Sequence, residues 1–439
     1  MKFFFPDSQD LVDPTFDFTT ERRSRDRLRH RDDVYAHQVF SERVYDGLLV
    51  SKGMVDAFGP GGGKYTLAQR HRLLRVGAKE FFRLQDTAGQ PLEIMGDCGA
   101  FTYVREKVPP YSVDEVLGFY EECRFDLGIS LDHVILAFQA TWDEPGHADQ
   151  IPSDVQERQD LTLELAEEFL AKHKARRLPF QPLGVAQGWS PRSYASAVNR
   201  LQKIGYTRIA LGGMVPLKTL EILATLEAIS PVRKSKTQLH LLGVTRCDSV
   251  IRFRDYGVTS FDSTSPLRQA FKDERDNYYT MDRTYTAVRI PQVEGNPGLQ
   301  KRIKAGQVPQ ELARQHERRC LDLLREYDAG RSSLDDVVAA LRGYEQIYDP
   351  AHDHSDAYRE VLAARPWSSC ACDVCKALGY HVILFRGAER NRRRGFHNLW
   401  VLYRRLRREL GLPIPAAEET RVAHRRSRGE ALASRTALP

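Results

Sequence analysis

Polar side chains and glycines follow several short apolar runs of this sequence, where strands would end and loops begin. The set comprises Asp97, Phe101, Asp132, Gln187, Gly212, Gly213 and Asp262. Two carboxylates can exchange a glycosidic bond, because one attacks the anomeric carbon while the other moves a proton on the leaving group. A further carboxylate and an amide can read the edge of a base, on which an aromatic ring can stack. A glycine lets a backbone N–H approach the ligand closely. A helix N-cap explains any single Asp of this kind, but the agreement of five strand ends favours one shared site.

Three of the seven cysteines are crowded into one short stretch, as Cys370, Cys372 and Cys375. The odd total argues against a closed set of disulfides, and such crowding in a reducing compartment indicates metal or redox chemistry. Tetrahedral zinc takes four ligands, so three thiolates need one more. His381 and His397 both lie downstream. The alternative is a group of buried thiols without a metal.

Arginine is concentrated in four blocks, residues 22–31, 386–394, 404–408 and 421–428. The whole chain carries 65 lysines and arginines against 59 acidic residues, a formal net charge of +6. Blocks on such a balanced background indicate a local site for a polyanion. Any one block could be a solvated helix face, but several blocks, two of them beside the cysteines, favour nucleic acid as a partner.

Short apolar runs alternate with amphipathic segments between about residues 45 and 265. The runs are residues 47–51, 92–96, 133–138, 183–186, 208–211, 239–244 and 258–261, with helical segments at 155–173, 194–204 and 217–229. Repeated strand–helix–strand alternation predicts an α/β protein with a mainly parallel sheet. Seven candidate strands, without a Gly-x-Gly-x-x-Gly after the first, favour a (β/α)₈ TIM barrel over a dinucleotide-binding sheet.

We divide the chain into five parts. They are an N-terminal extension (1–45), the catalytic barrel (46–306), a helical segment (307–355), a zinc-binding subdomain with a closing helix (356–412) and a basic tail (413–439). The tail lacks a periodic apolar pattern and is predicted to be disordered. No stretch approaches 18 apolar residues, and the first ten residues are too short and polar for a secretory signal. We therefore predict a cytoplasmic protein without a membrane span.

Five segments resemble motifs of the tRNA-guanine transglycosylase superfamily, in the same order along the chain. Residues 97–101 (DCGAF) are similar to its Asp-Ser-Gly-Gly-Phe/Tyr motif, 184–188 (GVAQG) to its glycine–glutamine–glycine strand end and 210–213 (ALGG) to its glycine pair. Residues 242–244 (LGV) and 257–263 (GVTSFDS) resemble the next strand and the nucleophile segment. The resemblance covers about residues 90–405. It implies a barrel enzyme, a pentosyltransferase, that exchanges guanine in a polynucleotide for a 7-deazaguanine.

The resemblance also implies a role for each residue of the set. Asp262 would be the nucleophile on the anomeric carbon and Asp97 the general acid/base. Phe101 would stack on the base, and the remaining residues would bind it, namely Asp132, Gln187, Gly212 and Gly213. Cys98 and Ala100 stand where the motif has serine and glycine, so this loop differs from that of the tRNA enzymes.

The segment 396–399 (FHNL) resembles the family's His-Asn-Leu, whose histidine completes a structural Cys₃His zinc site. This makes His397, rather than His381, the predicted fourth ligand beside the three cysteines. The zinc would have no open position, so its predicted role is structural.

Two segments resemble the DpdA branch of the superfamily, which places 7-cyano-7-deazaguanine (preQ0) in DNA. They are residues 3–14, with FFFPDS and VDP, and 389–395 (ERNRRRG). The resemblance implies DNA as substrate, preQ0 as the incoming base and companion proteins of a DNA-modification cluster. Arg392, Arg393 and Arg394 are the predicted phosphate-binding residues.

Two alternatives stay open. One is a tRNA-guanine transglycosylase with the same chemistry, acting on tRNA. The other is a non-catalytic, zinc-containing partner subunit that only binds nucleic acid. Retention of both Asp97 and Asp262 argues against the second alternative, because a subunit without activity has no need of the pair.

Overall fold

The computed structural model describes residues 1–57, 63–84, 91–272 and 275–413. The chain divides into two compact units, which are treated separately below. Unit 1 comprises residues 1–9, 45–264 and those that follow 405, and unit 2 comprises residues 10–44 and 265–405. The predicted tail, apart from residue 413, lies outside the described residues.

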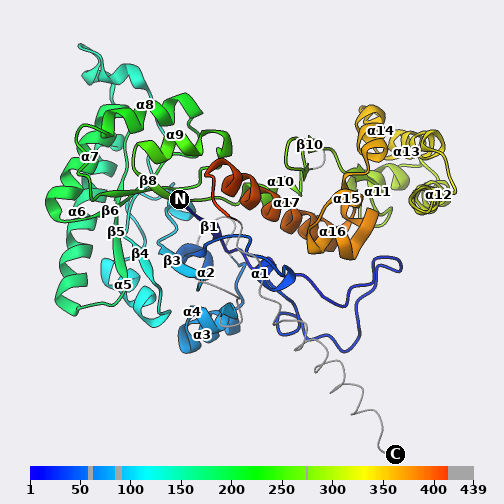
Figure 1. Ribbon diagram of the computed structural model, residues 1–439, viewed down its shortest axis with the longest axis horizontal. Coiled ribbons are helices and arrows are strands. Elements are labelled where there is room, and N and C mark those ends of the chain that lie inside the picture. Colours follow the sequence, from blue (N-terminus) through cyan, green and yellow to red (C-terminus); the bar gives the residue numbers. More distant parts are fainter. Residues whose placement is uncertain (58–62, 85–90, 273–274, 414–439) are drawn as a thin grey trace, which may run out of the picture. The chain divides into compact units, whose positions relative to one another are not determined.

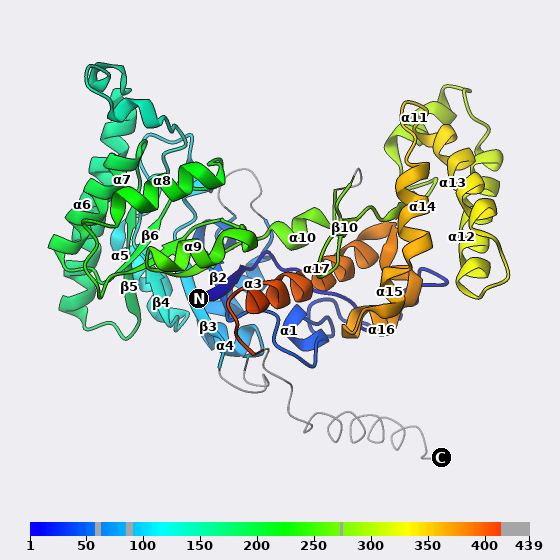
Figure 2. The ribbon, with the colours of Figure 1, turned by 45° about the horizontal axis from the view of Figure 1, so that its top comes forward.

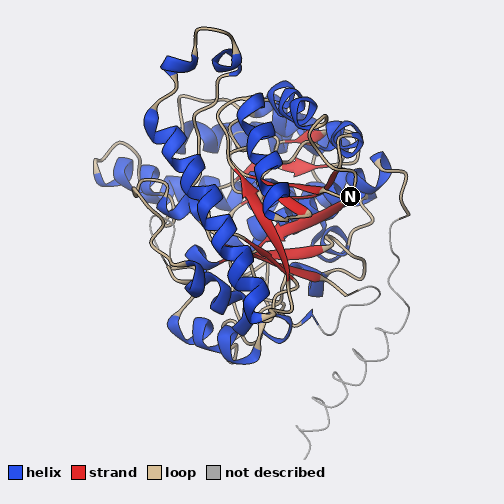
Figure 3. Cartoon of the chain, turned by 90° about the vertical axis from the view of Figure 1, so that its left-hand side faces the viewer, coloured by secondary structure: helices blue, strands red, loops and turns tan. Residues whose placement is uncertain are grey.

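Unit 1 is a closed barrel of eight parallel strands, which confirms the predicted fold class. The strands are β1 (Lys2–Pro6), β2 (Gly47–Ser51), β3 (Glu93–Asp97), β4 (Leu127–Ile129), β5 (Gln181–Ala186), β6 (Arg208–Leu211), β7 (Gln238–Leu241) and β8 (Val258–Asp262). Each pairs with its neighbour in sequence, and β1 also pairs with β8. Figure 3 shows the strands side by side with helices around them. Apolar side chains fill the interior, among them Phe4, Leu49, Met95, Leu127, Ile129, Leu183, Val185 and Ala210.

Helices connect successive strands of the barrel (Figure 1). They are α2 (Lys52–Val55), α3 (Leu67–Val76), α4 (Ala78–Phe81), α5 (Val113–Glu122), α6 (Ser153–Arg176), α7 (Pro191–Ile204), α8 (Thr219–Ile229) and α9 (Val250–Asp255), with short 3₁₀ helices at Ala100–Tyr103, Ala140–Asp143, Ala148–Gln150 and Cys247–Ser249. Local sequence sets their ends. The Ser190 hydroxyl caps α7, Pro191 opens it, and Gly205 ends it with a φ of 118°, a left-handed conformation that favours glycine.

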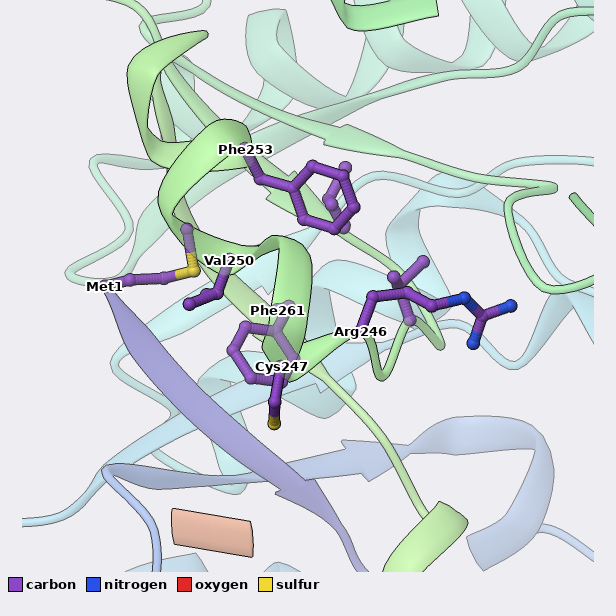
Figure 4. A pocket seen from close by; sticks show the side chains of 8 residues that line it. Met1, Arg246, Cys247, Val250, Phe253 and Phe261 are labelled. Carbon is purple, nitrogen blue, oxygen red and sulfur yellow. The ribbon is translucent and has the colours of Figure 1, made fainter. Parts of the chain in front are cut away.

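The first barrel strand lies in the segment that we expected to be an extension outside the barrel. Phe3, Phe4 and Phe5 are buried in β1, and Phe4 is in register with Asp262 of β8. Figure 4 shows the start of the chain against β8 and α9, around a cavity of about 10 Å³ lined by Met1, Val250 and other residues. A space of this size holds at most one water molecule, so the cavity is a packing feature.

The fourth strand also differs from the prediction. We expected a strand over residues 133–138, but β4 ends at Ile129, and residues 133–138 form a loop in which the first three residues are buried and Leu136 is 45% exposed. Its backbone bonds to side chains instead of to a neighbouring strand. The His133 N–H donates to the Thr162 hydroxyl, and the Ile135 N–H donates to Gln187 Oε1. Apolar character therefore indicated burial for the first half of the run only, and it did not indicate the type of element.

Unit 2 is mainly helical. Its helices are α1 (Ala36–Val39), α10 (Ser265–Gln269), α11 (Pro297–Lys304), α12 (Gln310–Asp328), α13 (Leu334–Tyr348), α14 (Ser355–Ala364), α15 (Pro366–Ser369), α16 (Asp373–Leu378) and α17 (Gly387–Glu409, to residue 405 in this unit), with a 3₁₀ helix at Gly379–Ile383. Its strands are β9 (Tyr278–Tyr279), β10 (Thr284–Tyr285), β11 (Val288–Arg289) and β12 (Leu384–Phe385), paired β9–β10 and β11–β12. Unit 2 therefore contains the predicted helical segment, the predicted zinc-binding subdomain as far as residue 405, and residues 10–44 of the expected extension. It also contains residues 265–306, which we expected in the barrel, because the last barrel strand already ends at Asp262.

Helix α17 is the central element of unit 2 and lies beside α10 (Figure 2). A Cβ at Gly395 would come within 2.4 Å of Leu267 Cδ1, so only glycine allows this close approach without a shift. Among the described residues, no helix is long and apolar enough to cross a membrane.

Candidate active site and metal centre

The carboxylate of Asp262 stands at the end of β8, where two donors hold one of its oxygens. His240 Nε2 lies 3.2 Å and the Gly243 N–H 3.0 Å from Asp262 Oδ1. His240 is a buried residue of β7, and its Nδ1 is 2.9 Å from the Ser260 hydroxyl oxygen. A carboxylate only accepts, so Nε2 carries the proton, and in the neutral ring Nδ1 accepts from Ser260. Both of these bonds to Asp262 use Oδ1, and neither uses Oδ2.

Asp97 ends β3 and differs in protonation from an ordinary carboxyl group. Burial raises its pKa to about 7, with help from the negative charges of Asp132 and Asp262, while bonds from the Ser51 hydroxyl and the Gly99 N–H oppose the rise. The side chain keeps part of its exposure at the carboxyl end of the strand. A carboxyl with a pKa near neutrality can both give and take a proton at physiological pH, as a general acid/base must.

Asp132 is buried in a network that engages both of its oxygens. The Cys98 thiol donates to Oδ1 at 3.0 Å, and Gln187 Nε2 donates to Oδ2 at 2.6 Å. The Tyr103 hydroxyl donates to the Cys98 sulfur at 3.0 Å. Burial raises the pKa of Cys98 well above its usual range, so this residue remains a thiol and a donor. Burial also raises the pKa of Asp132, against the lowering effect of these two bonds.

The two glycines after β6 expose bare backbone beside this network. Gly213 has a φ of 69°, and a Cβ there would lie 2.4 Å from the Ile135 carbonyl oxygen. A Cβ at Gly212 would lie 2.1 Å from Gln187 Nε2. A side chain at either position would displace the loop or Gln187, so the space beside the amide depends on both glycines. Phe101 follows Asp97 in the 3₁₀ helix Ala100–Tyr103 and is 52% exposed, which leaves its ring free to stack on a ligand.

The predicted metal ligands come together in unit 2. Cys370, Cys372, Cys375 and His397 offer ligand atoms that lie within 4.8 Å of one another. The three sulfurs are 3.6, 3.4 and 3.3 Å from His397 Nδ1. Zinc–sulfur and zinc–nitrogen bonds of ordinary length at a tetrahedral angle place the two ligand atoms roughly 3.6 Å apart. The group therefore has the donor atoms and the spacing that a metal ion of this kind requires.

The surroundings orient the histidine for this task. Its Nε2 is 2.7 Å from the Tyr279 carbonyl oxygen, which fixes the tautomer and turns Nδ1 toward the sulfurs. The Tyr278 ring stacks on the imidazole with a centroid distance of 4.2 Å, and its hydroxyl is 3.3 Å from the Cys375 sulfur. His381 lies outside the ligand group, stacks on Tyr380 and contacts the Phe18 ring at a tilt. The structure therefore brings His397, and not His381, together with the three cysteines.

The three arginines predicted to hold phosphates point largely into the protein. Arg394 is fully buried, and its guanidinium donates to the carbonyls of Leu384 and Ala270 at 2.9 and 2.6 Å. Arg393 is 8% exposed and donates to the Asp13 carbonyl at 2.6 Å. Arg392 keeps 23% of its side-chain exposure, 3.7 Å from an Asp10 oxygen. A phosphate strand could not reach Arg393 or Arg394 without rearrangement, so we do not retain these two as binding residues.

Sequence reasoning missed His240 and Ser51 and noted Cys98 only as a departure from a motif. One signal was present for His240, a single polar residue inside the apolar run 239–244. Ser51 is the last residue of a predicted strand and ends β2 as Asp97 ends β3, where the two residues are in register.

Comparison with known proteins supplies a close relative. The chain is 49% identical over 418 residues to a DNA-guanine transglycosylase of Salmonella montevideo, across 94% of this chain and 98% of that protein. No protein-family model matches the chain.

Proposed function

Because the chain belongs to the DNA-guanine transglycosylase family, we propose that this enzyme replaces guanine in DNA with preQ0 through a covalent aspartyl–deoxyribose intermediate. One observation carries the proposal. Two carboxylates at the carboxyl ends of β3 and β8 of one barrel differ in state, Asp97 with a pKa near 7 and Asp262 with one oxygen held by two donors. Carboxyl ends of barrel strands are where such enzymes build their sites.

In the first half of the proposed reaction, Asp262 Oδ2 attacks the anomeric carbon of the target deoxyguanosine. The bond from that carbon to the guanine nitrogen breaks, and Asp97 gives its proton to the departing base. The Oδ1 atom, held by His240 and the Gly243 N–H, becomes the carbonyl oxygen of the ester. Two bonds to one oxygen thus fix which oxygen reacts and how the carboxylate is turned.

In the second half, preQ0 loses its ring N–H proton to Asp97 and attacks the same carbon. The bond to Asp262 Oδ2 breaks, which regenerates the carboxylate. Two displacements at one carbon retain the configuration, so the new base has the same β linkage as the guanine that left. Asp97 starts and ends the cycle protonated, and no outside proton source is needed.

Base recognition rests on the network around Asp132 in this proposal. The guanine edge offers N–H donors that suit the Asp132 carboxylate, and a carbonyl that suits Gln187 Nε2 and the Gly213 N–H. In the structure described here, Asp132 and Gln187 bond to each other. The entering base must therefore take over that bond, while Cys98 continues to hold Oδ1 of Asp132.

The Cys₃His group would hold a structural zinc ion. Four protein ligands leave no open position for substrate, so the ion would fix the fold of the surrounding segments rather than take part in base exchange. We further propose that the enzyme acts in the cytoplasm with companion proteins of a DNA-modification cluster. A guanine paired in duplex DNA must leave the stack to reach any such pocket.

The test is base exchange with radiolabelled guanine in DNA and, separately, in tRNA, in the presence of preQ0. Loss of label from DNA supports the proposal, whereas loss from tRNA alone identifies a tRNA enzyme.

Denaturing electrophoresis then tests for the covalent adduct between the enzyme and DNA. Asp262→Asn should abolish adduct and exchange, and Asp97→Asn should retain a trapped adduct while exchange collapses. Asp255→Asn, an exposed carboxylate on α9, is the matched control. An adduct in Asp262→Asn would overturn the nucleophile, and no exchange by wild type with any partner would favour a binding subunit.

A further inference from the structure

Residues 22–31 form a strongly basic surface loop of unit 2. The ten residues contain six arginines and one acidic residue, Asp26. The segment around them is closed at its base, where Val12 and Val34 exchange two backbone hydrogen bonds of 3.0 and 2.9 Å. The two ends of the segment that contains the loop are therefore held together by backbone hydrogen bonds.

Three of the six arginines form ion pairs, either with acidic residues of the same segment or with α17. Arg27 donates two hydrogen bonds of 2.7 Å to the Asp33 carboxylate and is only 10% exposed. Arg23 forms an ion pair of 2.9 Å with the buried Glu389 of α17. Arg31 pairs with its neighbour Asp32 at 2.9 Å.

The arginines of α17 hold the same segment from the other side. Arg386 donates to both oxygens of Glu21, at 2.6 and 2.7 Å, and Arg390 also bonds to this carboxylate. Burial alone would raise the pKa of Glu21, but the bonds from Arg386 and Gln292 and the charges of both arginines outweigh it and lower the pKa to about 2. Figure 1 shows the N-terminal segment alongside α17.

The remaining arginines of the loop, Arg22, Arg25 and Arg29, are exposed. In the part of the chain that the structure describes, no ion pair engages these three side chains. Acidic partners are thus distributed unevenly, because Asp13, Asp33, Glu21 and Glu389 neutralise the anchoring arginines only. A loop that is anchored by these contacts and presents three unpaired guanidinium groups is suited to a partner with regularly spaced negative charges.

We infer that the loop 22–31 is a binding surface for the phosphate backbone of duplex DNA, with Arg22, Arg25 and Arg29 as its contacts. This inference rests on the proposed function for the identity of the polyanion. It replaces the predicted role of Arg393 and Arg394, which lie on the same helix as the anchors and are buried. Contacts of this kind carry no sequence information, so the surface would contribute affinity for any duplex.

The test compares two variants that each lose three positive charges. Arg22→Gln, Arg25→Gln and Arg29→Gln are combined in one. Arg252→Gln, Lys304→Gln and Arg319→Gln, exposed on α9, α11 and α12, are combined in the control. Binding of a 30-base-pair DNA of arbitrary sequence is measured between 50 and 200 mM salt. Each phosphate contact contributes about 0.9 to the slope of log K against log salt. We expect the loop variant to lose about two to three in slope and at least tenfold in affinity, and the control to lose neither.

Several outcomes would overturn the inference. They are an unchanged slope in the loop variant, an equal loss in the control, or a loss confined to duplex RNA of the same length. The melting temperatures of both variants should match that of wild type, because the substituted side chains are exposed. Base exchange by wild type is scored separately. If wild type exchanges guanine in DNA but the loop variant binds DNA normally, the surface is wrong and the proposed function stands. If the loop variant loses DNA binding but wild type exchanges guanine only in tRNA, the binding surface is correct and the proposed function is wrong.

Discussion

His240 Nε2 and the Gly243 N–H both bond to the same oxygen of Asp262, at 3.2 and 3.0 Å. That oxygen carries about half of the negative charge of a carboxylate and much less charge as the carbonyl of an ester. The two bonds therefore favour the free carboxylate, and they assist its departure from the sugar in the second half of the proposed reaction.

His240→Ala should slow the resolution of the adduct by preQ0 about tenfold more than it slows adduct formation, since one bond to a charged group is worth about 1.5–3 kcal/mol. His240→Gln, which keeps an amide N–H at a similar reach, should recover part of the loss. Single-turnover electrophoresis measures the two steps separately, with DNA affinity as the check on binding. Equal slowing of both steps would reduce His240 to a packing residue.

Adduct formation should depend on pH through Asp97. The proton that the leaving guanine needs is held with a pKa of about 7, so the first half of the reaction should lose rate progressively as pH rises above 7. At pH 9 the loss should approach about a hundredfold, because each pH unit removes a factor of ten of the protonated form. A rate of adduct formation that is constant from pH 6 to 9 would contradict this role.

Asp97 should also cost the folded state stability at alkaline pH. Its folded pKa lies above the ordinary value of 3.8, so its unfavourable contribution develops as pH rises from about 4 to 7 and is complete above that range. At pH 8, Asp97→Asn should be more stable than wild type by roughly 1–3 kcal/mol, less than the full shift implies because the side chain is partly exposed. The difference should vanish below pH 4. Urea unfolding of both proteins at pH 4 and 8 provides the measurement.

Ionised Glu21 stabilises the folded state, whereas ionised Asp97 destabilises it. Its pKa is lowered from 4.5 to about 2, so it stabilises unit 2 above pH 4.5, and this contribution is lost as pH falls toward 2. At pH 7, Glu21→Gln should destabilise by about 3 kcal/mol, because it removes the carboxylate that two buried arginines share. Glu360→Gln, which breaks an exposed pair with Arg283, should change stability by less than about 1 kcal/mol. Similar denaturant midpoints for the two variants would show that the anchor is unimportant.

Removal of one thiolate should release the metal ion. Cys372→Ala leaves three of the four ligands, so bound zinc should fall from one equivalent to well below one, and unit 2 should melt at a lower temperature. Cys247→Ala, which removes a cysteine outside the ligand group, should keep its zinc. Elemental analysis of both purified proteins decides the matter, and full metal content in Cys372→Ala would exclude the site.

The sequence predicted the site residues best where each of them lies at the end of an apolar run that forms a barrel strand. Asp97, Gln187 and Asp262 each end an apolar run, and the structure places each of them at or directly after the end of a barrel strand. The strand at residues 2–6 was harder to find, because a continuous run of Phe without alternation is compatible with a buried parallel strand, a helix or a packed terminus.

The arginine block of α17 shows that composition alone does not predict which arginines are exposed. Consecutive helical residues point about 100° apart, so Arg392, Arg393 and Arg394 cannot share one exposed face. Arg390, Arg393 and Arg394 lie three and four residues apart on the buried side of the helix, where their partners are carbonyl groups and a carboxylate from distant segments. Those partners are brought together only by the tertiary fold, which the count of arginines does not contain.

The pairing of β1 with β8 has a consequence for the chain while the ribosome is still making it. Phe4 can pair with Asp262 only after Asp262 has been synthesised. At a synthesis rate of about 5–20 residues per second, this happens roughly 13–50 s later. Until then the first strand has one unpaired edge rich in Phe, a state that invites association with other nascent chains. The strand that closes the barrel is also the strand that carries the proposed nucleophile. A chain that terminates early therefore has neither a closed barrel nor a reactive site, and an incomplete product cannot act on a base.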